Sequence, residues 1–211
     1  MKVQKANLEA SGGYGVARCA EVERKTAETA ITVRLNLDGT GEACIDSGQG
    51  FFDHMLQQVV KFSLIDLELS CAGDIKVDFH HSAEDIGLTL GTALAEALGE
   101  RRGIRRYADV RVPMDEALAE VCLDFSGRPY LVFRGEFSQE RSGEFELCLV
   151  REFLQGLAQK AGLTLHVNLL YGYNAHHEAE AIFKALGLAL RKALSKDERR
   201  DGIPSTKGSL V

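Results

Sequence analysis

The sequence predicts an α+β protein built from two copies of one half-domain, and three observations support this prediction. Segments with the two-residue period of half-buried strands and segments of helical period follow the order strand, strand, helix, strand, helix, and this order occurs twice. The sequence His-His-x-x-Glu occurs twice, at 80–84 and at 176–180, and a similarly spelled helix follows each copy. We therefore expect two small mixed sheets, each with two helices, packed helix face to helix face.

The elements of the first half can be assigned in order. Residues 30–37 alternate apolar and polar side chains and predict a strand that ends at an Asp-Gly turn. Residues 51–62 have helical spacing, and residues 64–79 predict two short strands around a Gly-Asp turn. Residues 83–98 predict a strongly amphipathic helix, with Gly103 marking its end.

The elements of the second half follow the same order. Residues 118–137 predict two strands around the turn formed by Ser126-Gly127-Arg128-Pro129. Residues 145–161 predict a helix, and residues 163–170 predict a strand. A second strongly amphipathic helix is predicted over residues 179–194.

The duplication can be checked by comparing residue numbers. A shift of 96 positions carries one His-His-x-x-Glu motif onto the other and also aligns the helices that follow. Because an internal repeat determines the architecture, we expect the two halves to share one fold. The positions that the shift superimposes are His80, His81, Glu84, Leu90, Gly91, Leu94, Ala97 and Leu98 on His176, His177, Glu180, Leu186, Gly187, Leu190, Ala193 and Leu194.

The repeat also indicates a domain organisation for the 211 residues. A chain of this length suits one large domain or two half-domains that cover each other's apolar faces. The predicted boundaries are an N-terminal extension at 1–25, a first half-domain at 26–103, a second half-domain at 104–196 and a C-terminal tail at 197–211.

Composition limits the class of partner and the compartment. The net charge of −6 and the absence of a basic stripe argue against nucleic acid as a partner. No stretch approaches the roughly 20 apolar residues of a membrane helix, and the N-terminus has no apolar core of signal-peptide length. The five cysteines are scattered and form no CxxC pair, which is typical of reduced thiols. We expect a cytoplasmic protein without membrane or nucleic-acid partners.

The duplicated motif has the chemistry of a metal site. On a helix, His80 and Glu84 share a face, whereas His80 and His81 point about 100° apart and would serve different ions. A single histidine is more often a structural residue than a ligand, but the duplication favours ligands. Imidazole and carboxylate without thiolate suit manganese, iron, nickel or zinc.

Three further residues are candidates near these motifs. His54 is a fifth possible imidazole ligand and precedes His80 by 26 residues. Glu152 precedes His176 by 24 residues, so it lies roughly where a repeat of His54 would fall. A carboxylate could replace an imidazole there, or Glu152 could be an ordinary surface residue. His166 lies in a predicted strand, where a hydrogen-bonded histidine without a metal is at least as good an interpretation.

Basic residues predict a small anion site. In the terminal segment GIPSTKGSLV, a hydroxyl, an ammonium group and a backbone N–H come from Ser205, Lys207 and Gly208. Lys184 lies one turn beyond Glu180 on the same predicted helix. Arg106 and Arg128 are further candidates, although each cation alone is more often a solvated surface residue.

Several longer segments resemble the imidazoleglycerol-phosphate dehydratase family of histidine biosynthesis. The resemblance runs from about Arg24 to Leu210, with every motif in order. The segments are FFDHMLQQ, DFHHSAEDIGLTLG, MDEALAEVCLDFSGRPYL, LTLHVNLLYGYNAHHEAEAIFKALGLALR and PSTKG.

The resemblance implies a fold, an assembly and an activity. The fold would be two half-domains of the ribosomal-protein-S5-like type, and the assembly a cage of 24 subunits with active sites at subunit contacts. The activity would be that of a carbon-oxygen hydro-lyase with two Mn²⁺ ions per subunit. It would dehydrate D-erythro-imidazoleglycerol phosphate to imidazole acetol phosphate.

The resemblance also implies residue roles, carried over motif by motif. The metal ligands would be His54, His80, His81, Glu84, His176, His177 and Glu180. The substrate contacts would be Glu28 and Gln58, and the phosphate binders would be Arg106, Arg128, Lys184, Ser205 and Lys207. The groups expected to act at the reacting atoms are Glu180, Glu84, His81 and His177, with Glu180 as the expected base.

The chain departs from the family pattern at two positions. Many members have a histidine ligand where this chain has Glu152, and we predict that Glu152 takes the ligand role. Many members also have a histidine near the substrate where this chain has Phe62, so position 62 is left out of the expected site.

Three other functions use the same residues differently. A binuclear metal-dependent hydrolase of phosphate esters would release inorganic phosphate instead of a ketone. A non-catalytic metal-binding oligomer would bind the ions without turnover. An S5-like RNA-binding module is disfavoured by the acidic net charge.

Overall fold

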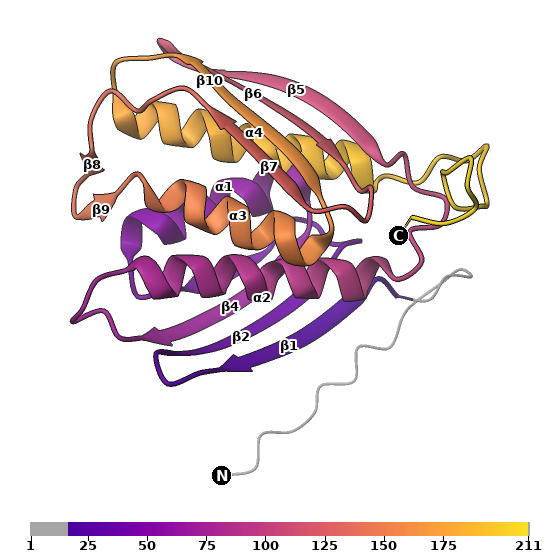
Figure 1. Ribbon diagram of the computed structural model, residues 1–211, viewed down its shortest axis with the longest axis horizontal. Helices are drawn as coiled ribbons and strands as arrows, with labels where there is room; N and C mark the ends of the chain where they lie inside the picture. Colours follow the sequence, from indigo (N-terminus) through magenta and orange to yellow (C-terminus); the bar gives the residue numbers. More distant parts are fainter. Residues whose placement is uncertain (1–16, 211) are drawn as a thin grey trace.

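The computed structural model describes residues 17–210, and Figure 1 shows their arrangement. Residues 1–16 of the expected N-terminal extension, and Val211 of the tail, lie outside the described residues. Within residues 17–210, no helix combines the length and the apolar character needed to cross a bilayer.

The first half forms a four-stranded mixed sheet with two helices. Its strand order is β1-β2-β4-β3, antiparallel except for the parallel pair of β3 and β4. Helix α1 lies between β3 and β4 in the sequence, and α2 follows β4. The elements are β1 (Cys19–Lys25), β2 (Thr29–Asn36), β3 (Ala43–Asp46), α1 (Gly50–Ser63), β4 (Asp66–Gly73) and α2 (His80–Leu98).

The second half repeats this topology with one insertion. Its strand order is β5-β6-β10-β7, again antiparallel except for the last pair. The insertion is a short hairpin, β8 (Arg141–Ser142) with β9 (Phe145–Glu146), between β7 and α3. The other elements are β5 (Tyr107–Met114), β6 (Ala117–Asp124), β7 (Tyr130–Arg134), α3 (Leu149–Ala161), β10 (Thr164–Tyr171) and α4 (Ala175–Leu194). The predicted α+β class with duplicated half-domains is confirmed.

The four helices lie between the two sheets (Figure 1). Each helix pair joins the two halves, because α1 packs on α4 and α2 packs on α3. Strand β2 alternates strictly between inward-facing buried residues and outward-facing residues, and β6 does the same. Burying these inward faces against the helices supplies the main stabilising term of the fold.

Glycines allow both helix pairs to approach closely. A Cβ atom added to Gly187 of α4 would lie 2.7 Å from the carbonyl oxygen of Val59 on α1. A Cβ atom added to Gly91 of α2 would lie 2.6 Å from the carbonyl oxygen of Leu157 on α3. These two glycines are related by the shift of 96 residues, so the duplication preserved the crossing point together with the motif.

An aromatic cluster fills the space where the helices of the two halves meet. Phe52 of α1 contacts Phe153 of α3 edge-to-face at a centroid distance of 5.2 Å. Phe153 in turn stacks on Phe183 of α4 at 5.8 Å, and all three side chains are fully buried. Because the rings come from three helices and both halves, they fix the position of α1 relative to α4.

Five strands were missed in the sequence, and one predicted strand is absent. The short strands β8 and β9 are among those missed, and β9 lies in a segment predicted as the start of a helix that begins only at Leu149. The missed strands β1 and β5 lie at sheet edges and β3 is only four residues long, so none carries a strong apolar alternation. Strand β1 belongs to the first sheet, although its residues were assigned to the extension. The second strand predicted within 64–79 is absent. Ile75 and Val77 alternate as in a strand but are exposed, since both edges of β4 are already paired.

The boundaries of the first motif helix also differ from the prediction. Helix α2 begins at His80, three residues earlier than predicted, so both histidines lie in its first turn. It ends at Leu98, and Gly99, not Gly103, follows as its C-terminal cap with φ of 52°. A positive φ at this position is typical of glycine after a helix.

We expect the substitution Gly187→Ala to lower the free energy of unfolding by about 1–3 kcal/mol, because the added methyl group collides with backbone of α1. Denaturant unfolding of the purified protein measures this change. Gly50→Ala is the matched control, since a Cβ atom at that helical glycine meets nothing within 4 Å. Equal stability of the Gly187→Ala protein would show that the crossing is not close-packed.

Candidate metal centre and substrate site

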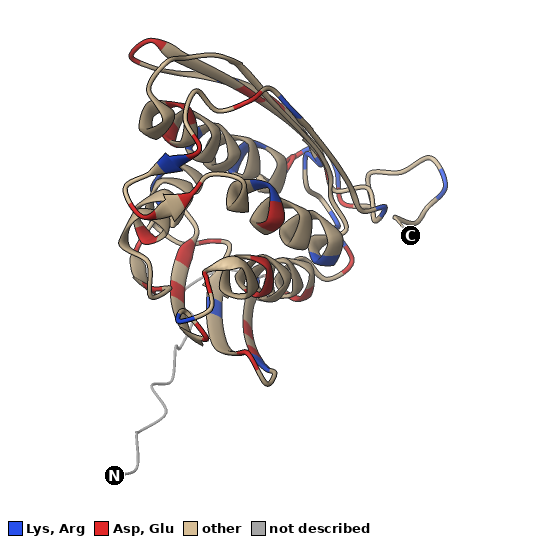
Figure 2. Cartoon of the chain, turned by 60° about the vertical axis from the view of Figure 1, so that its left-hand side comes forward, with Lys and Arg blue, Asp and Glu red and all other residues tan. Residues whose placement is uncertain are grey.

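Both His-His-x-x-Glu motifs lie at the same end of the molecule. Contacts of His54 with Glu180 and of Val59 with Gly187 show that α1 and α4 run in the same direction. Helices α2 and α4 both begin at the left-hand end in Figure 1. Figure 2 brings this end forward and shows acidic residues on both halves around it. The positive ends of the helix dipoles and these carboxylates therefore occupy one region.

Three candidate ligands meet between α1 and α4. The Nε2 atom of His54 lies 2.6 Å from Oε1 of Glu180, and Nε2 of His176 lies 3.4 Å from the same oxygen. One ligand atom from each residue falls within 4.8 Å of the others, a spacing that could hold a metal ion. Within residues 17–210, no other group of three histidine, cysteine or acidic side chains comes so close together.

Glu180 also carries an ion pair with Lys184. The ammonium group of Lys184 donates to Oε2 of Glu180 at 2.5 Å, and to the sulfur of Met114 at 3.1 Å. Burial opposes ionisation of the Glu180 carboxyl group, but hydrogen bonds from Lys184 and His54 outweigh it and lower its pKa to about 2. Glu180 is therefore an anion at neutral pH, although its side chain is almost wholly buried.

His177 is bound by a carboxylate outside this cluster. Its Nδ1 atom lies 2.8 Å from Oε2 of Glu116, in the hairpin between β5 and β6. The other carboxylate oxygen of Glu116 accepts hydrogen bonds from the backbone N–H groups of Tyr173 and Asn174. The hydrogen bond with Glu116 raises the pKa of His177, and the hydrogen bond from His177 is the largest cause that lowers the pKa of Glu116 to about 2.

His81 has the same kind of partner in the first half. Its Nδ1 atom lies 3.0 Å from Oδ2 of Asp74, in the segment between β4 and α2. Its Nε2 atom lies 3.7 Å from Oε1 of Glu28, in the hairpin between β1 and β2. The hydrogen bond with Asp74 is the largest cause of a raised pKa at His81. The predicted substrate contact Glu28 is thus beside one of the two motifs.

The first-half counterpart of the cluster is more open. Nε2 of His80 lies 3.9 Å from Oε2 of Glu84, a distance too long for a hydrogen bond. Glu152 precedes Leu157 by five residues on α3, just as His54 precedes Val59 by five residues on α1. Leu157 and Val59 are the residues whose carbonyl groups lie against Gly91 and Gly187 at the two helix crossings, so Glu152 and His54 occupy equivalent positions. It is half-buried, and it does not join His80 and Glu84 in a three-ligand group among the described residues. Its ligand role stays a prediction.

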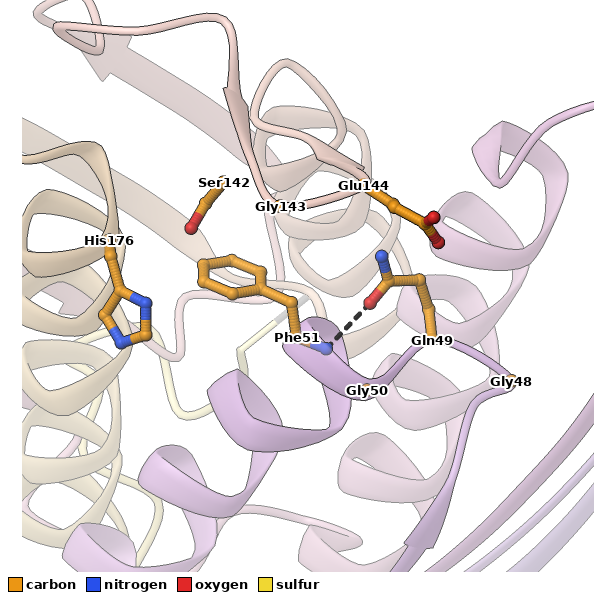
Figure 3. A pocket seen from close by; sticks show the side chains of 8 residues that line it. All are labelled: Gly48, Gln49, Gly50, Phe51, Ser142, Gly143, Glu144 and His176. Atoms are coloured by element: carbon orange, nitrogen blue, oxygen red, sulfur yellow. Dashed lines mark hydrogen bonds between the residues drawn. The ribbon is translucent and has the colours of Figure 1, made fainter.

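A pocket of about 460 Å³ opens beside His176. Figure 3 shows His176 from α4 facing Phe51 at the start of α1, with Ser142 and Glu144 of the β8–β9 hairpin above. The side chain of Gln49 accepts from the backbone N–H of Phe51 at 2.7 Å and so caps α1. Gln58, one turn beyond His54, places its amide nitrogen 3.4 Å from Nε2 of His54.

The candidate phosphate binders lie at two separate ends of the molecule. Lys184 is beside Glu180, whereas the Arg106 backbone N–H donates to the carbonyl of Ala193 at the far end of α4. Ala193 is 17 residues beyond His176, or about 25 Å along the helix axis. The guanidinium group of Arg106 donates to both oxygens of Asp124 and, at 2.6 Å, to the carbonyl of Pro204.

The remaining basic residues belong to that far end. Through Pro204, Arg106 holds the tail segment that carries Ser205 and Lys207. The backbone N–H of Lys207 donates to the hydroxyl of Ser205, which folds the segment into a turn with the Lys207 side chain exposed. Arg128 is exposed in the turn between β6 and β7.

Sequence reasoning missed two residues of this region, Asp74 and Glu116. Both bind the second histidine of a motif, yet neither belongs to the repeat that drew attention to the histidines. Glu116 is 61 residues from His177, so only the fold brings the two together. The one available signal is the acidic pair Asp115-Glu116 just before the strands predicted over 118–137, and such a pair is too common to identify a site.

These observations define a class of protein: a duplicated α+β chain with a candidate metal centre built from side chains of both halves. Comparison with known proteins then identifies the family. The sequence profile named imidazoleglycerol-phosphate dehydratase matches residues 47–190. The imidazoleglycerol-phosphate dehydratase of Methylobacterium radiotolerans is 57% identical over 194 residues, covering 92% of this chain and 100% of that protein. That of Paracidovorax citrulli is 56% identical over 194 residues, covering 92% and 93%.

Solved structures of two relatives have the same fold. The enzyme from Staphylococcus aureus superimposes with a TM-score of 0.77 at 37% identity, covering 85% of this chain and 99% of that one. The structure from Pyrococcus furiosus, in complex with (S)-C348, also has a TM-score of 0.77, at 36% identity, with coverage of 90% and 100%. The chain belongs to the imidazoleglycerol-phosphate dehydratase family.

We expect the substitution His54→Asn to weaken binding of a divalent cation by about 10-fold or more. Even the loss of a residue that only hydrogen-bonds to a metal ligand has an effect of this size, and His54 is a candidate ligand itself. Titration calorimetry of chelator-treated protein with Mn²⁺ measures the change. His166→Asn is the control, because His166 is an exposed strand histidine outside the cluster. Equal affinity of the His54→Asn protein and the wild type would exclude this cluster as the metal centre.

Proposed function

We propose that this chain dehydrates imidazoleglycerol phosphate to imidazole acetol phosphate in histidine biosynthesis, with Mn²⁺ as its cofactor. Membership of the family and the identity of 57% to a relative of that name support the reaction. The observation that carries the metal dependence is the meeting of His54, His176 and Glu180 between the two halves. The five cysteines are all free thiols, which supports a reducing compartment such as the cytoplasm.

The donor set fits a divalent cation. Two imidazole nitrogens and one ionised carboxylate suit manganese and similar ions, and the site contains no thiolate. His54, His176 and Glu180 would hold one ion, and we assign His80, Glu84 and Glu152 to a second, with His81 and His177 as further ligands. A bound cation would supply Lewis-acid polarisation of the substrate's hydroxyl groups.

Glu180 and Lys184 would act as a pair during the reaction. The reaction removes water across two hydroxyl-bearing carbons, and the proton to be removed is poorly acidic because no carbonyl group is beside it. While Lys184 and His54 both bind it, Glu180 is a weak base. A role for Glu180 as the base therefore requires Lys184 to leave it, and a substrate phosphate or hydroxyl group is a suitable new partner.

Residues near the two motifs would orient the substrate. Glu28 lies within 3.7 Å of His81, and the amide of Gln58 lies within 3.4 Å of His54, so both can bind polar groups of a substrate held at the histidines. The pocket beside His176 offers room for an imidazole ring and a short glycerol arm.

The separation of the candidate residues supports a site shared between copies of the chain. The cluster and the tail are about 25 Å apart along α4, which far exceeds the length of imidazoleglycerol phosphate. If Arg128, Ser205 and Lys207 bind its phosphate, they belong to a different copy from the cluster. We therefore assign the protein to a closed homo-oligomer, with the family's cage of 24 subunits as the expected form.

We expect turnover of imidazoleglycerol phosphate to disappear after treatment with a chelator and to return when Mn²⁺ is added, because a bound cation would supply the polarisation of the substrate's hydroxyl groups. The assay follows ketone and inorganic phosphate together, so that dehydration and ester hydrolysis are separated. Ketone formed only with metal supports the proposal.

Two other results would replace the proposed dehydratase function with a different one. Inorganic phosphate without ketone would identify a phosphate-ester hydrolase that uses the same ligands. Metal binding without either product in a fully loaded, assembled sample would identify a non-catalytic metal-binding oligomer.

We also expect two inactive variants to restore activity when they are co-expressed. A His54→Asn chain keeps its tail and a Lys207→Met chain keeps its cluster, so mixed assemblies contain some complete sites. Random mixing gives about a quarter of the wild-type activity, because each site draws its two parts independently. Co-expression of His54→Asn with His176→Asn is the control and should restore nothing. The same lack of recovery in the first mixture would show that one chain forms the whole site.

A further inference from the structure

The second histidine of each motif is bound by a carboxylate through the same ring atom. Nδ1 of His177 lies 2.8 Å from Glu116, and Nδ1 of His81 lies 3.0 Å from Asp74. The first histidine of each motif has no such partner at Nδ1 among the hydrogen bonds of residues 17–210. The arrangement thus distinguishes the two histidines of each doublet in the same way in both halves.

The two carboxylates come from non-equivalent positions in the two half-domains. Glu116 is in the β5–β6 hairpin, whose first-half counterpart is the β1–β2 hairpin with Glu28, whereas Asp74 directly follows β4, and the residue after the equivalent strand β10 is Gly172. Each half has therefore supplied a carboxylate to the same ring nitrogen from a different element, which a purely inherited contact does not explain.

The carboxylate of Glu116 is held in place by hydrogen bonds at both of its oxygens. One oxygen of Glu116 binds His177, while the other accepts from the backbone N–H groups of Tyr173 and Asn174. These two residues lead directly into α4, and Asn174 caps that helix by accepting from the N–H of His176. Glu116 therefore fixes the start of α4 and the ring of His177 together.

The chemistry of the contact determines which nitrogen of the ring keeps its lone pair, and at Nε2 of His177 the one hydrogen-bond partner among residues 17–210 is the amide nitrogen of Asn174, at 3.5 Å. An ionised carboxylate can only accept a hydrogen bond, so Nδ1 of His177 and of His81 must donate. The lone pair of the neutral ring is then on Nε2, which is the atom left to bind a cation. The rings of His176 and His177 are nearly perpendicular, at 89°. Nε2 of His177 therefore points in a different direction from the ring of His176, which belongs to the cluster with His54 and Glu180.

We propose that Glu116 and Asp74 are positioning residues that select the tautomer and the direction of His177 and His81 for binding a divalent cation. This inference rests on the proposed function, because it assigns both histidines to metal binding. Neither carboxylate is itself a ligand.

The substitution Glu116→Gln tests the proposal without disturbing the helix start. The glutamine oxygen can still accept from Tyr173 and Asn174, while its NH₂ group faces Nδ1 of His177. An NH₂ group can only donate, so it favours the tautomer whose Nε2 carries the hydrogen and cannot bind a metal. We expect Mn²⁺ affinity to fall about 10- to 100-fold, measured by calorimetry on the chelator-treated full chain without substrate.

Asp74→Asn provides the same test in the first half and keeps the proposal testable should one variant fail to fold. Glu120→Gln is the matched control. Glu120 is also a hydrogen-bonded carboxylate, bound by Arg111 and Asn168 on the outer face of the second sheet, with no histidine as partner. Its substitution changes the net charge equally and should leave Mn²⁺ affinity unchanged.

The outcomes separate this inference from the proposed function. Weaker Mn²⁺ binding by Glu116→Gln and Asp74→Asn, with Glu120→Gln like wild type, supports the positioning role. Wild-type affinity in both variants overturns it and leaves the proposed function intact. A loss of equal size in Glu120→Gln would also overturn it, because net charge would then explain the effect. A wild-type protein that binds no Mn²⁺ would overturn both.

Discussion

The close approach of α4 to α1 at Gly187 is the constraint on which the site depends. With no side chain at this position, the backbone of Val59 comes within van der Waals reach, and the two helices run alongside each other in the same direction. His54 then lies one to two turns before the crossing, directly beside Glu180. The buried rings of Phe52, Phe153 and Phe183 hold this geometry from the other side. The cluster of candidate metal ligands is therefore a product of core packing and needs no dedicated loop.

Much of the architecture could be predicted because the informative signals are local. The repeat of His-His-x-x-Glu with its helix established the duplication, and the helical spacing of residues 83–98 and 179–194 was strong enough to locate both motif helices. The edge strands β1 and β5 were missed because each pairs with only one neighbouring strand, and their inward-facing residues are less completely buried than those of β2 and β6. The segment after β4 has strand-like alternation at Ile75 and Val77, but pairing depends on a free sheet edge, and a sequence pattern cannot reveal whether one exists.

The site was predictable as a set of residue types and not as a set of contacts. His54, His176 and Glu180 were all candidates, and the fold brings them together. The pairing of Glu116 with His177, and that of Asp74 with His81, depends on where a hairpin and a strand end fall in space. The placement of Arg106 and the tail at the far end of α4 likewise follows from the topology, since the chain reaches the tail only after the whole length of that helix.

The position of the tail has a consequence for how the protein responds to dilution. A chain that has its candidate cation ligands at one end and Arg106, Arg128, Ser205 and Lys207 at the other can be completely folded and, if its sites are shared between copies as we propose, still lack a complete site. Mass action would then act on catalysis separately from folding, because a falling protein concentration would separate the two parts of each shared site before any strand or helix unfolds. Specific activity would depend on protein concentration in a range where circular dichroism reports an unchanged fold.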